Sequence, residues 1–259
     1  MECIIDKLKI NYADEGQGDA VLILHGWGSN IEAFNYIANE LKEKRRIIRV
    51  DMPGFGKSDI PKEPWNVDMY VDFIIKFISK IGLDKLTLIG HSFGGRVIIK
   101  LFSKDKLSFY IDKVVLIDSA GILPKKSFKS KVRLKVFKCG KKLLLLKPIK
   151  NMFPNALDKF RGLFGSSDYN NVSGIMRDTL VKVVNEDLEV YLKYINVPTL
   201  LIWGDKDTAT PLSDGQKMEA AIKDSGLVVV KNAGHFSFID DSYLVVSVLK
   251  SFLFPKENV

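Results

Sequence analysis

One serine is flanked by glycines in a pattern that could produce a nucleophile. Ser92 lies in GHSFGG, after the apolar run LTLI and before a segment with helical periodicity. A G-x-S-x-G pattern in this context predicts a sharp strand-to-helix turn that exposes the serine hydroxyl. Gly90 and Gly94 have no Cβ, so neighbouring backbone can approach this turn closely. The N-terminus of the following helix favours negative charge that develops there.

A serine hydroxyl reacts well only when a base takes its proton, and the chain has three histidines to choose from. His235 follows the last apolar run, in NAGHFSF, and its position makes it the best base. His91 adjoins Ser92 on the tight turn, so its side chain is expected to point elsewhere. His25 ends the run LILH. We therefore predict that His235 is the base and that His25 and His91 have structural roles.

The base needs a carboxylate that fixes its tautomer and stabilises the imidazolium. The segment WGDKDTATP offers Asp205 and Asp207, and Asp118 ends the apolar run VVLID. Their spacing alone leaves all three aspartates as candidates for this carboxylate. The oxyanion of an acyl-transfer reaction needs two backbone N–H donors, which we place at Phe93, after the serine, and at Trp27 in HGWGS. This chemistry requires no metal or organic cofactor.

The candidate residues follow short, near-continuous apolar runs that alternate with amphipathic segments. Such runs are typical of strands buried on both faces of a parallel sheet. The βαβα rhythm predicts an open α/β sheet, mostly parallel and covered by helices on both faces. The predicted strands are 20–26, 47–51, 86–90, 114–118, 199–204 and 227–234. The predicted helices are 32–42, 67–81, 93–103, 213–223 and 242–252.

One interval interrupts this rhythm. Residues 122–197 contain no convincing strand, only basic and amphipathic stretches, which indicates a helical insertion between two strands. The predicted organisation is a core of residues 1–121 and 198–259 with an insertion of residues 122–197.

The motifs taken together resemble those of the α/β-hydrolase superfamily over essentially the whole chain. The matching segments are HGWG, DMPGFGKSD, GHSFGG, WGDKDTATP and AGHFSF, in the family's order and spacing. The likeness is closest to small bacterial esterases and to carbon–carbon bond hydrolases with a helical cap. It implies a Ser92, Asp207 and His235 triad, and it favours Asp207 over Asp205. It also implies that residues 122–197 are the cap, inserted after the sixth strand.

The insertion begins with a strongly basic stretch. Residues 122–161 carry thirteen Lys/Arg against one acid, Asp158, while the net charge of the whole chain is +8. Apolar residues recur there every three or four positions, which predicts amphipathic helices. We interpret the stretch first as a cap helix over the active site and second as a peripheral contact with anionic membrane. Nucleic-acid binding ranks last, because no recognition motif accompanies the charge.

The overall composition is that of a globular protein. Hydrophobic residues make up 46% of 259, which is enough for a sizeable core. The two cysteines form no disulfide framework, and no signal peptide or run of about 18 apolar residues is present. We expect a soluble cytoplasmic protein.

These residues are compatible with three functions. The first is a carboxylesterase or thioesterase that acts on a small-molecule acyl substrate through an acyl-enzyme. The second is a carbon–carbon bond hydrolase with the same triad. The third is a non-enzymatic binding protein of the same fold, which the intact triad disfavours because such relatives usually lose a triad member.

Overall fold

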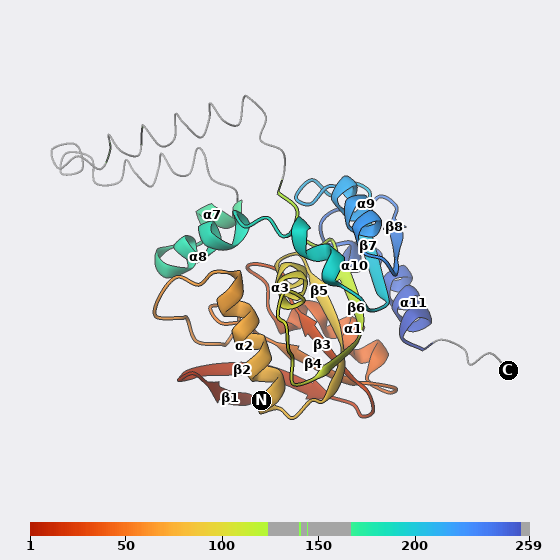
Figure 1. The fold of residues 1–259 in the computed structure, drawn as a ribbon, viewed down its shortest axis with the longest axis horizontal. Helices are drawn as coiled ribbons and strands as arrows, with labels where there is room; N and C mark the ends of the chain where they lie inside the picture. Colours follow the sequence, from red (N-terminus) through yellow and green to blue (C-terminus); the bar gives the residue numbers. More distant parts are fainter. Residues whose placement is uncertain (124–139, 141–143, 145–166, 255–259) are drawn as a thin grey trace.

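The computed structural model describes residues 1–123, 140, 144 and 167–254, and within them eight strands form one sheet (Figure 1). Their order across the sheet is β1-β2-β4-β3-β5-β6-β7-β8. The β1–β2 and β2–β4 pairs are antiparallel, and the other pairs are parallel. The strands are β1 Glu2–Ile5, β2 Leu8–Glu15, β3 Ala20–Leu24, β4 Arg46–Val50, β5 Lys85–His91, β6 Tyr110–Ile117, β7 Thr199–Gly204 and β8 Ser225–Val230. The predicted mostly parallel α/β sheet is confirmed.

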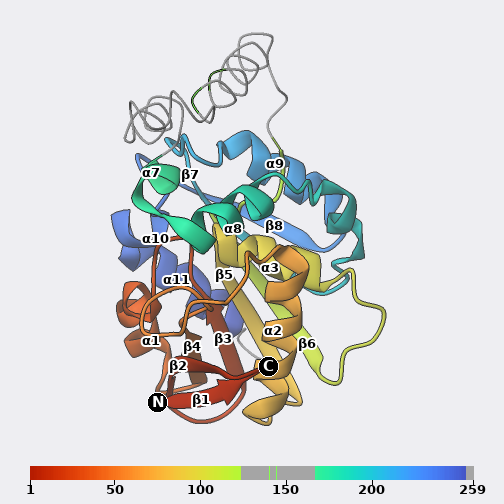
Figure 2. The same ribbon diagram turned by 90° about the vertical axis from the view of Figure 1, so that its left-hand side faces the viewer.

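The central strands are buried on both faces, as their continuous apolar sequences predict. In β3, Leu22 and Leu24 pack into the core on one face of the sheet, and Val21 and Ile23 pack into the core on the other. Side chains alternate between the faces of a strand, so both sets must be apolar when both faces are covered. Helices α2 (Val67–Lys80) and α3 (Phe93–Leu101) cover the first face, and α1 (Asn35–Leu41) and α11 (Ser242–Leu253) cover the second (Figures 1 and 2).

Helix α2 shows how the sequence defines its own elements. The Asn66 side chain caps the helix by accepting a hydrogen bond of 3.0 Å from the Met69 amide. Residues three and four apart then bury one apolar stripe against the sheet. The buried residues are Val67, Tyr70, Val71, Phe73, Ile74, Phe77 and Ile78. The remaining helices outside the insertion are η1 Ile31–Phe34, α9 Leu212–Ala221 and α10 Ser237–Asp240.

The described part of the insertion is helical. It comprises α7 Ser167–Asn171, α8 Gly174–Val184 and the 3₁₀ helix η2 Glu189–Tyr194. Helices α7 and α8 lie beyond the end of the sheet that is opposite the N-terminus (Figure 2). Most of residues 122–166, including nearly all of the basic stretch, lies outside the described residues. The cap, the domain boundaries and the membrane contact therefore stay predictions.

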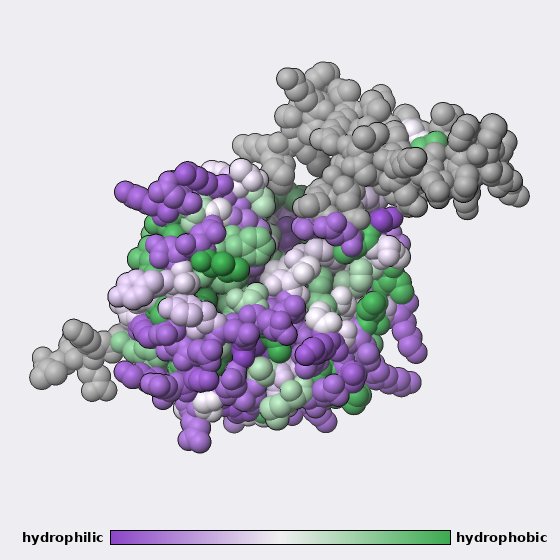
Figure 3. Space-filling model, turned by 180° about the vertical axis from the view of Figure 1, so that it is seen from behind, coloured by the Kyte–Doolittle hydropathy of each residue, from purple (hydrophilic) through white to green (hydrophobic). Residues whose placement is uncertain are grey.

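Polar and apolar side chains alternate over the surface seen in Figure 3, without one dominant apolar area. In the part of the chain that the structure describes, no helix combines the length and apolarity that crossing a membrane requires.

Candidate active site

Ser92 occupies a sharp turn between strand β5 and helix α3, with no other residue between the two elements. Its backbone has φ 50° and ψ −109°, a conformation that side-chain-bearing residues rarely adopt. The Ser92 amide donates to the Ile117 carbonyl of the neighbouring strand over 3.1 Å. The predicted strand-turn-helix is therefore present, and its strain is held by the sheet.

Two glycines of GHSFGG are required by close backbone contacts. A Cβ on Gly94 would lie 2.1 Å from the carbonyl oxygen of Leu24 at the end of β3. A Cβ on Gly90 would lie 2.6 Å from the amide nitrogen of Gly95. Both distances are far below van der Waals contact, so only glycine lets helix α3 begin this close to the sheet.

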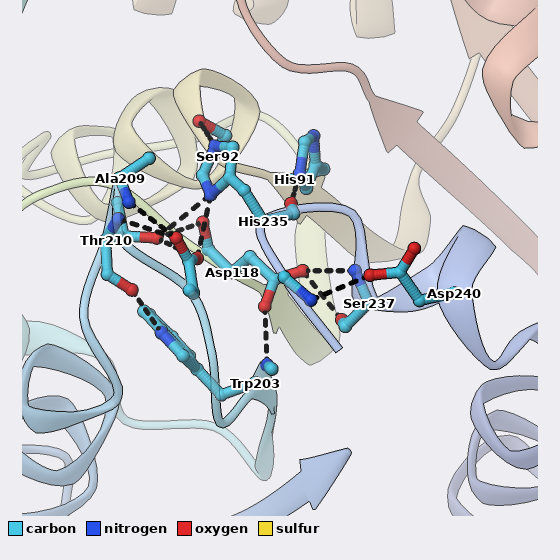
Figure 4. Close-up of polar contacts among 12 residues, drawn as sticks. His91, Ser92, Asp118, Trp203, Ala209, Thr210, His235, Ser237 and Asp240 are labelled. Atoms are coloured by element: carbon cyan, nitrogen blue, oxygen red, sulfur yellow. Dashed lines mark hydrogen bonds and ion pairs between the residues drawn. The ribbon is translucent and has the colours of Figure 1, made fainter. Parts of the chain in front are cut away.

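Among the three residues predicted as a triad, His235 lies within hydrogen-bond distance of both Ser92 and Asp207, and Figure 4 shows Ser92 beside His235. The Oγ of Ser92 is 2.9 Å from Nε2 of His235. The Nδ1 of His235 is 2.8 Å from Oδ2 of Asp207. With Nδ1–H donated to the carboxylate, Nε2 is left free to accept the serine proton.

The Asp207 carboxylate is held by donors from its own loop. Its Oδ1 accepts hydrogen bonds from the Ala209 amide at 2.8 Å and the Thr210 amide at 3.0 Å. The Thr210 hydroxyl lies 2.7 Å from Oδ2. Burial alone would raise the pKa of Asp207, but the hydrogen bonds from His235 and Thr210 outweigh it and hold the pKa below its ordinary value. Asp207 is thus ionised and fixed in orientation. The sequence reasoning did not find Thr210, although it lies in the motif WGDKDTATP.

The two alternative acids occupy different positions. Asp205 is exposed. Asp118 is fully buried, and it accepts from the Gly204 amide at 2.9 Å and from the Ser237 amide and hydroxyl at 2.9 and 2.6 Å (Figure 4). Burial outweighs these hydrogen bonds and raises the pKa of Asp118 to about 6. Asp118 therefore fixes the loop that carries His235, while Asp207 contacts the imidazole.

The other two histidines are buried and support the turn. His91 Nε2 donates to the backbone carbonyl of His235 over 2.8 Å (Figure 4). His25 Nδ1 donates to the Gly26 carbonyl over 2.7 Å, and its Nε2 accepts from the Met52 amide over 3.0 Å. Burial lowers the pKa of both rings, that of His91 to about 3, so both are neutral near pH 7. Neither ring forms a hydrogen bond with Ser92.

The two predicted oxyanion donors border the serine. The Phe93 amide belongs to the first turn of α3, where helix N–H groups have no intrahelical acceptor. Within residues 1–123 and 167–254, neither the Phe93 nor the Trp27 amide donates to a protein acceptor. Both residues line the same cavity as Ser92. Their amides are thus available to a bound oxygen.

A cavity of about 310 Å³ opens at Ser92. Helix α8 of the insertion contributes apolar side chains to it, and helix α3 contributes a buried arginine, Arg96, that the sequence reasoning missed. The lining residues are Trp27, Ser92, Phe93, Arg96, Ala120, Ile122, Leu123, Asp168, Leu180, Val183, Val184, Ala209, Thr210, Pro211, Asp214 and His235. Among the described residues, no three His, Cys, Asp or Glu side chains gather as a metal site would require.

Known proteins resemble this chain along most of its length. The AB hydrolase superfamily protein YisY of Bacillus subtilis (strain 168) is 30% identical over 257 residues, which cover 92% of this chain and 93% of that protein. The 2-hydroxymuconate semialdehyde hydrolase of Pseudomonas sp. (strain CF600) is 25% identical and covers 97% of this chain and 93% of its own length.

A solved structure and a family model agree with these relatives. The esterase EaEST from Exiguobacterium antarcticum superimposes with a TM-score of 0.73 at 27% identity, covering 96% of this chain and 97% of that one. The model of the family described as alpha/beta hydrolase fold matches residues 19–138 and 140–242. The chain therefore belongs to the alpha/beta hydrolase fold family, and this membership supports a hydrolase activity.

Proposed function

We propose that this protein is a carboxylic ester hydrolase that works through an acyl-enzyme. The observation that carries the proposal is the continuous hydrogen-bond chain from Ser92 through His235 to Asp207, with links of 2.9 and 2.8 Å, at the wall of a cavity. A serine, a histidine with a free Nε2 and an oriented carboxylate are the parts that nucleophilic acyl transfer needs.

Acylation begins when Ser92 Oγ attacks the carbonyl carbon of the ester. His235 Nε2 takes the hydroxyl proton as the bond forms, and the buried Asp207 carboxylate stabilises the resulting imidazolium. The carbonyl oxygen becomes an oxyanion that accepts hydrogen bonds from the Phe93 and Trp27 amides. The tetrahedral intermediate collapses, and His235 returns the proton to the leaving alkoxide, which departs as an alcohol.

Deacylation reverses these roles with water in place of the alcohol. His235 Nε2 takes a proton from water, the hydroxide attacks the acyl carbon, and the ester bond to Ser92 Oγ breaks. The proton returns to Ser92, and the free acid leaves. No bound cofactor enters any of these steps.

The cavity indicates the size of the substrate. Its volume of about 310 Å³ corresponds to roughly ten water molecules, so it suits short acyl and alcohol groups. Leu180, Val183 and Val184 of α8 give it an apolar side that favours an uncharged portion of the substrate. The likeness to the Exiguobacterium esterase supports the choice of an ester.

A second candidate is hydrolysis of a carbon–carbon bond. The chain is 25% identical to a 2-hydroxymuconate semialdehyde hydrolase over nearly its full length, and carbon–carbon bond hydrolases of this fold use the same triad. We rank it second because the loop HGWGSN lacks the further glycine-rich extension that many of those enzymes carry after the HG motif.

A fluorophosphonate probe and a series of p-nitrophenyl esters test the proposal directly. We expect the native protein to be labelled at Ser92 and to hydrolyse the acetate and butyrate esters faster than the decanoate ester. The Ser92→Ala variant should show no labelling and no turnover above background. A folded native protein with neither labelling nor turnover would exclude the serine mechanism.

The same preparation separates the two candidates. A vinylogous 1,5-diketone, the electronic arrangement that carbon–carbon bond hydrolases cleave, is offered beside the esters. Labelling of Ser92 together with turnover of the diketone alone would replace the first candidate with the second.

A further inference from the structure

A buried arginine lies one helical turn beyond the serine, inside the cavity. Arg96 is 4% exposed and lines the same cavity as Ser92. Residues four apart lie on the same helix face, about 6 Å apart at Cβ, and helical side chains lean toward the N-terminus. The Arg96 side chain therefore extends on the Ser92 side of α3.

The guanidinium of Arg96 has few partners. Of its five N–H donors, one Nη1–H bonds to the backbone carbonyl of Glu186 over 2.5 Å. Within the described residues it forms no direct ion pair with a carboxylate, although the negative charges of Glu186 and Asp187 act on it from a greater distance. Burial lowers its pKa to about 10, so it still carries its charge at neutral pH. A buried charge without a directly paired counter-ion is costly, and a bound ligand of opposite charge would offset part of that cost.

Lys100, one turn further along α3, shows what a structural cation looks like in this protein. It is 7% exposed, and its Nζ lies 2.6 Å from the Glu186 carboxylate and 3.3 Å from the Asp68 carboxylate. Lys100 does not line the cavity. The two buried cations on α3 thus differ in their ion pairs. Lys100, outside the cavity, pairs directly with two carboxylates, whereas Arg96, inside it, forms no direct ion pair and is influenced by Glu186 and Asp187 only from a greater distance.

The two acidic residues that line the cavity form no direct ion pair with Arg96 either. Asp214 pairs with Lys217, at 3.4 Å, and Asp168 is exposed to water. Neither forms an ion pair with Arg96. The cavity therefore combines Ser92, an apolar side from α8 and a guanidinium that forms no direct ion pair.

We propose that Arg96 is a specificity-determining residue that binds a substrate carboxylate, so that the preferred substrate is an ester carrying a second, ionised carboxyl group, such as a monoester of a short dicarboxylic acid. The planar guanidinium matches a carboxylate with two parallel hydrogen bonds. This inference rests on the proposed ester hydrolase function, and it names the substrate class of that site.

Paired substrates test the inference. The monoethyl esters of succinate and glutarate are compared with ethyl butyrate and ethyl valerate, which have the same chain lengths without the charge. We expect kcat/KM of the native protein to favour the monoesters. Arg96→Gln should lower kcat/KM for the monoesters roughly 10- to 100-fold, mainly through KM, and change it less than about threefold for the neutral esters.

Lys100→Gln is the matched control. It also removes a buried cation from α3 that contacts Glu186, but from outside the cavity. We expect it to lower the melting temperature while leaving the preference for monoesters unchanged. If Lys100→Gln abolishes the preference as fully as Arg96→Gln does, the effect arises from the Glu186 segment and the inference is overturned. If Arg96→Gln does not fold, Arg96→Lys takes its place, because it keeps the charge but loses the paired donors. We expect Arg96→Lys to lower kcat/KM for the monoesters several-fold.

A binding measurement keeps the inference separate from the proposed function. Monoethyl glutarate is titrated calorimetrically into Ser92→Ala and into Ser92→Ala/Arg96→Gln. Binding to the first that weakens at least tenfold in the second supports the inference even if no ester is turned over. Equal binding to both, or hydrolysis of neutral esters with no preference for monoesters, overturns it while leaving the ester hydrolase function in place.

Discussion

Two buried aspartates at the ends of neighbouring strands differ in their surroundings. Asp118 follows β6 and is 0% exposed, and Asp207 follows β7 and is 6% exposed. Asp118 accepts hydrogen bonds from neutral donors of Gly204 and Ser237, and its pKa is raised to about 6. Asp207 also bonds to the His235 ring, and its pKa is lowered. Both carboxylates are buried, but desolvation dominates the pKa of Asp118, whereas the hydrogen bonds from His235 and Thr210 outweigh it at Asp207.

The difference shows how the fold separates two tasks that a carboxylate can perform near a histidine. Asp207 orients the imidazole ring of His235, which becomes cationic during the proposed reaction. The negative charge of Asp207 then faces the positive charge of the imidazolium. Asp118 holds the backbone and hydroxyl of Ser237, two residues after His235, where no positive charge develops. Position relative to the ring, rather than burial, assigns the role of each acid.

The largest effect is expected for Asp207→Asn, which tests whether Asp207 is the acid that orients His235. An amide in place of the carboxylate keeps the shape of the loop but presents a donor or a weak acceptor to His235, which disturbs the required tautomer. We expect kcat for p-nitrophenyl acetate to fall by roughly 10³- to 10⁴-fold. Steady-state kinetics measure this, and an unchanged far-UV circular dichroism spectrum establishes that the variant is folded. A loss below tenfold would mean that Asp207 is not the orienting acid.

Asp118→Asn should affect stability instead. One amide N–H would face the Gly204 or Ser237 donor that the carboxylate now accepts from, and a buried donor would be left unsatisfied. We expect a decrease of about 1–3 kcal/mol in the free energy of unfolding and less than a tenfold change in kcat. Urea denaturation and kinetics on one preparation separate the two quantities. A kcat loss as large as that of Asp207→Asn would make Asp118 the acid of the triad.

The pH dependence of stability should have opposite signs for the two acids. Because the pKa of Asp118 is raised from 3.8 to about 6, its stabilising contribution is complete below about pH 4 and is lost as the pH rises through about 6. The lowered pKa of Asp207 gives a contribution that is present above its ordinary pKa and lost as the pH falls.

This sign can be measured with the same variant. Relative to Asp118→Asn, the native protein should gain roughly 1–3 kcal/mol of unfolding free energy between about pH 7 and pH 4.5. Urea titrations at four or five pH values provide the comparison. A difference that stays flat, or shrinks toward acid pH, would contradict a raised pKa at Asp118.

The smallest effect is expected at Thr210, whose hydroxyl lies 2.7 Å from the Asp207 carboxylate. Thr210→Val keeps the volume and removes the hydroxyl donor, so kcat/KM should fall roughly three- to tenfold, as the loss of one hydrogen bond predicts. Thr210→Ser is the matched control and should retain most of the activity. If the serine variant is as impaired as the valine variant, the methyl group matters rather than the hydroxyl.

Much of the sheet was predictable, because its strands are buried on both faces. Each apolar run that we predicted as a strand became one, β3 to β8. The β1–β2 hairpin was missed. Its turn places Asp6 at φ 49° and Lys7 at φ 67°, without the Asn-Gly or Asp-Gly pair that usually announces such a turn. Half-exposed strands at a sheet edge give a weak apolar signal.

The candidate site likewise contains residues that the sequence predicts and residues that it does not. The structure brings Ser92, Asp207 and His235 together, and the sequence predicts this because each follows a strand and their types and order suit one reaction. The contacts of Thr210 with Asp207 and of Arg96 with Glu186 are not predictable from the sequence, since spacing does not encode them. Arg96 stands in the apolar helix sequence FGGRVIIKL, and its burial follows from packing against the segment around Glu186, 90 residues away.

The hydrogen bond from His91 to the carbonyl of His235 has a mechanical consequence. Ser92 contacts the imidazole of His235, while the adjacent His91 contacts its main chain. Two consecutive residues therefore hold both the side chain and the backbone of His235. If the hydrogen bond between Ser92 and the imidazole breaks, the main chain of His235 is still held next to the nucleophile by His91. Burial lowers the pKa of the His91 ring to about 3, and Nε2–H is a donor in both the neutral and the protonated ring, so acidification does not break its bond to the His235 carbonyl.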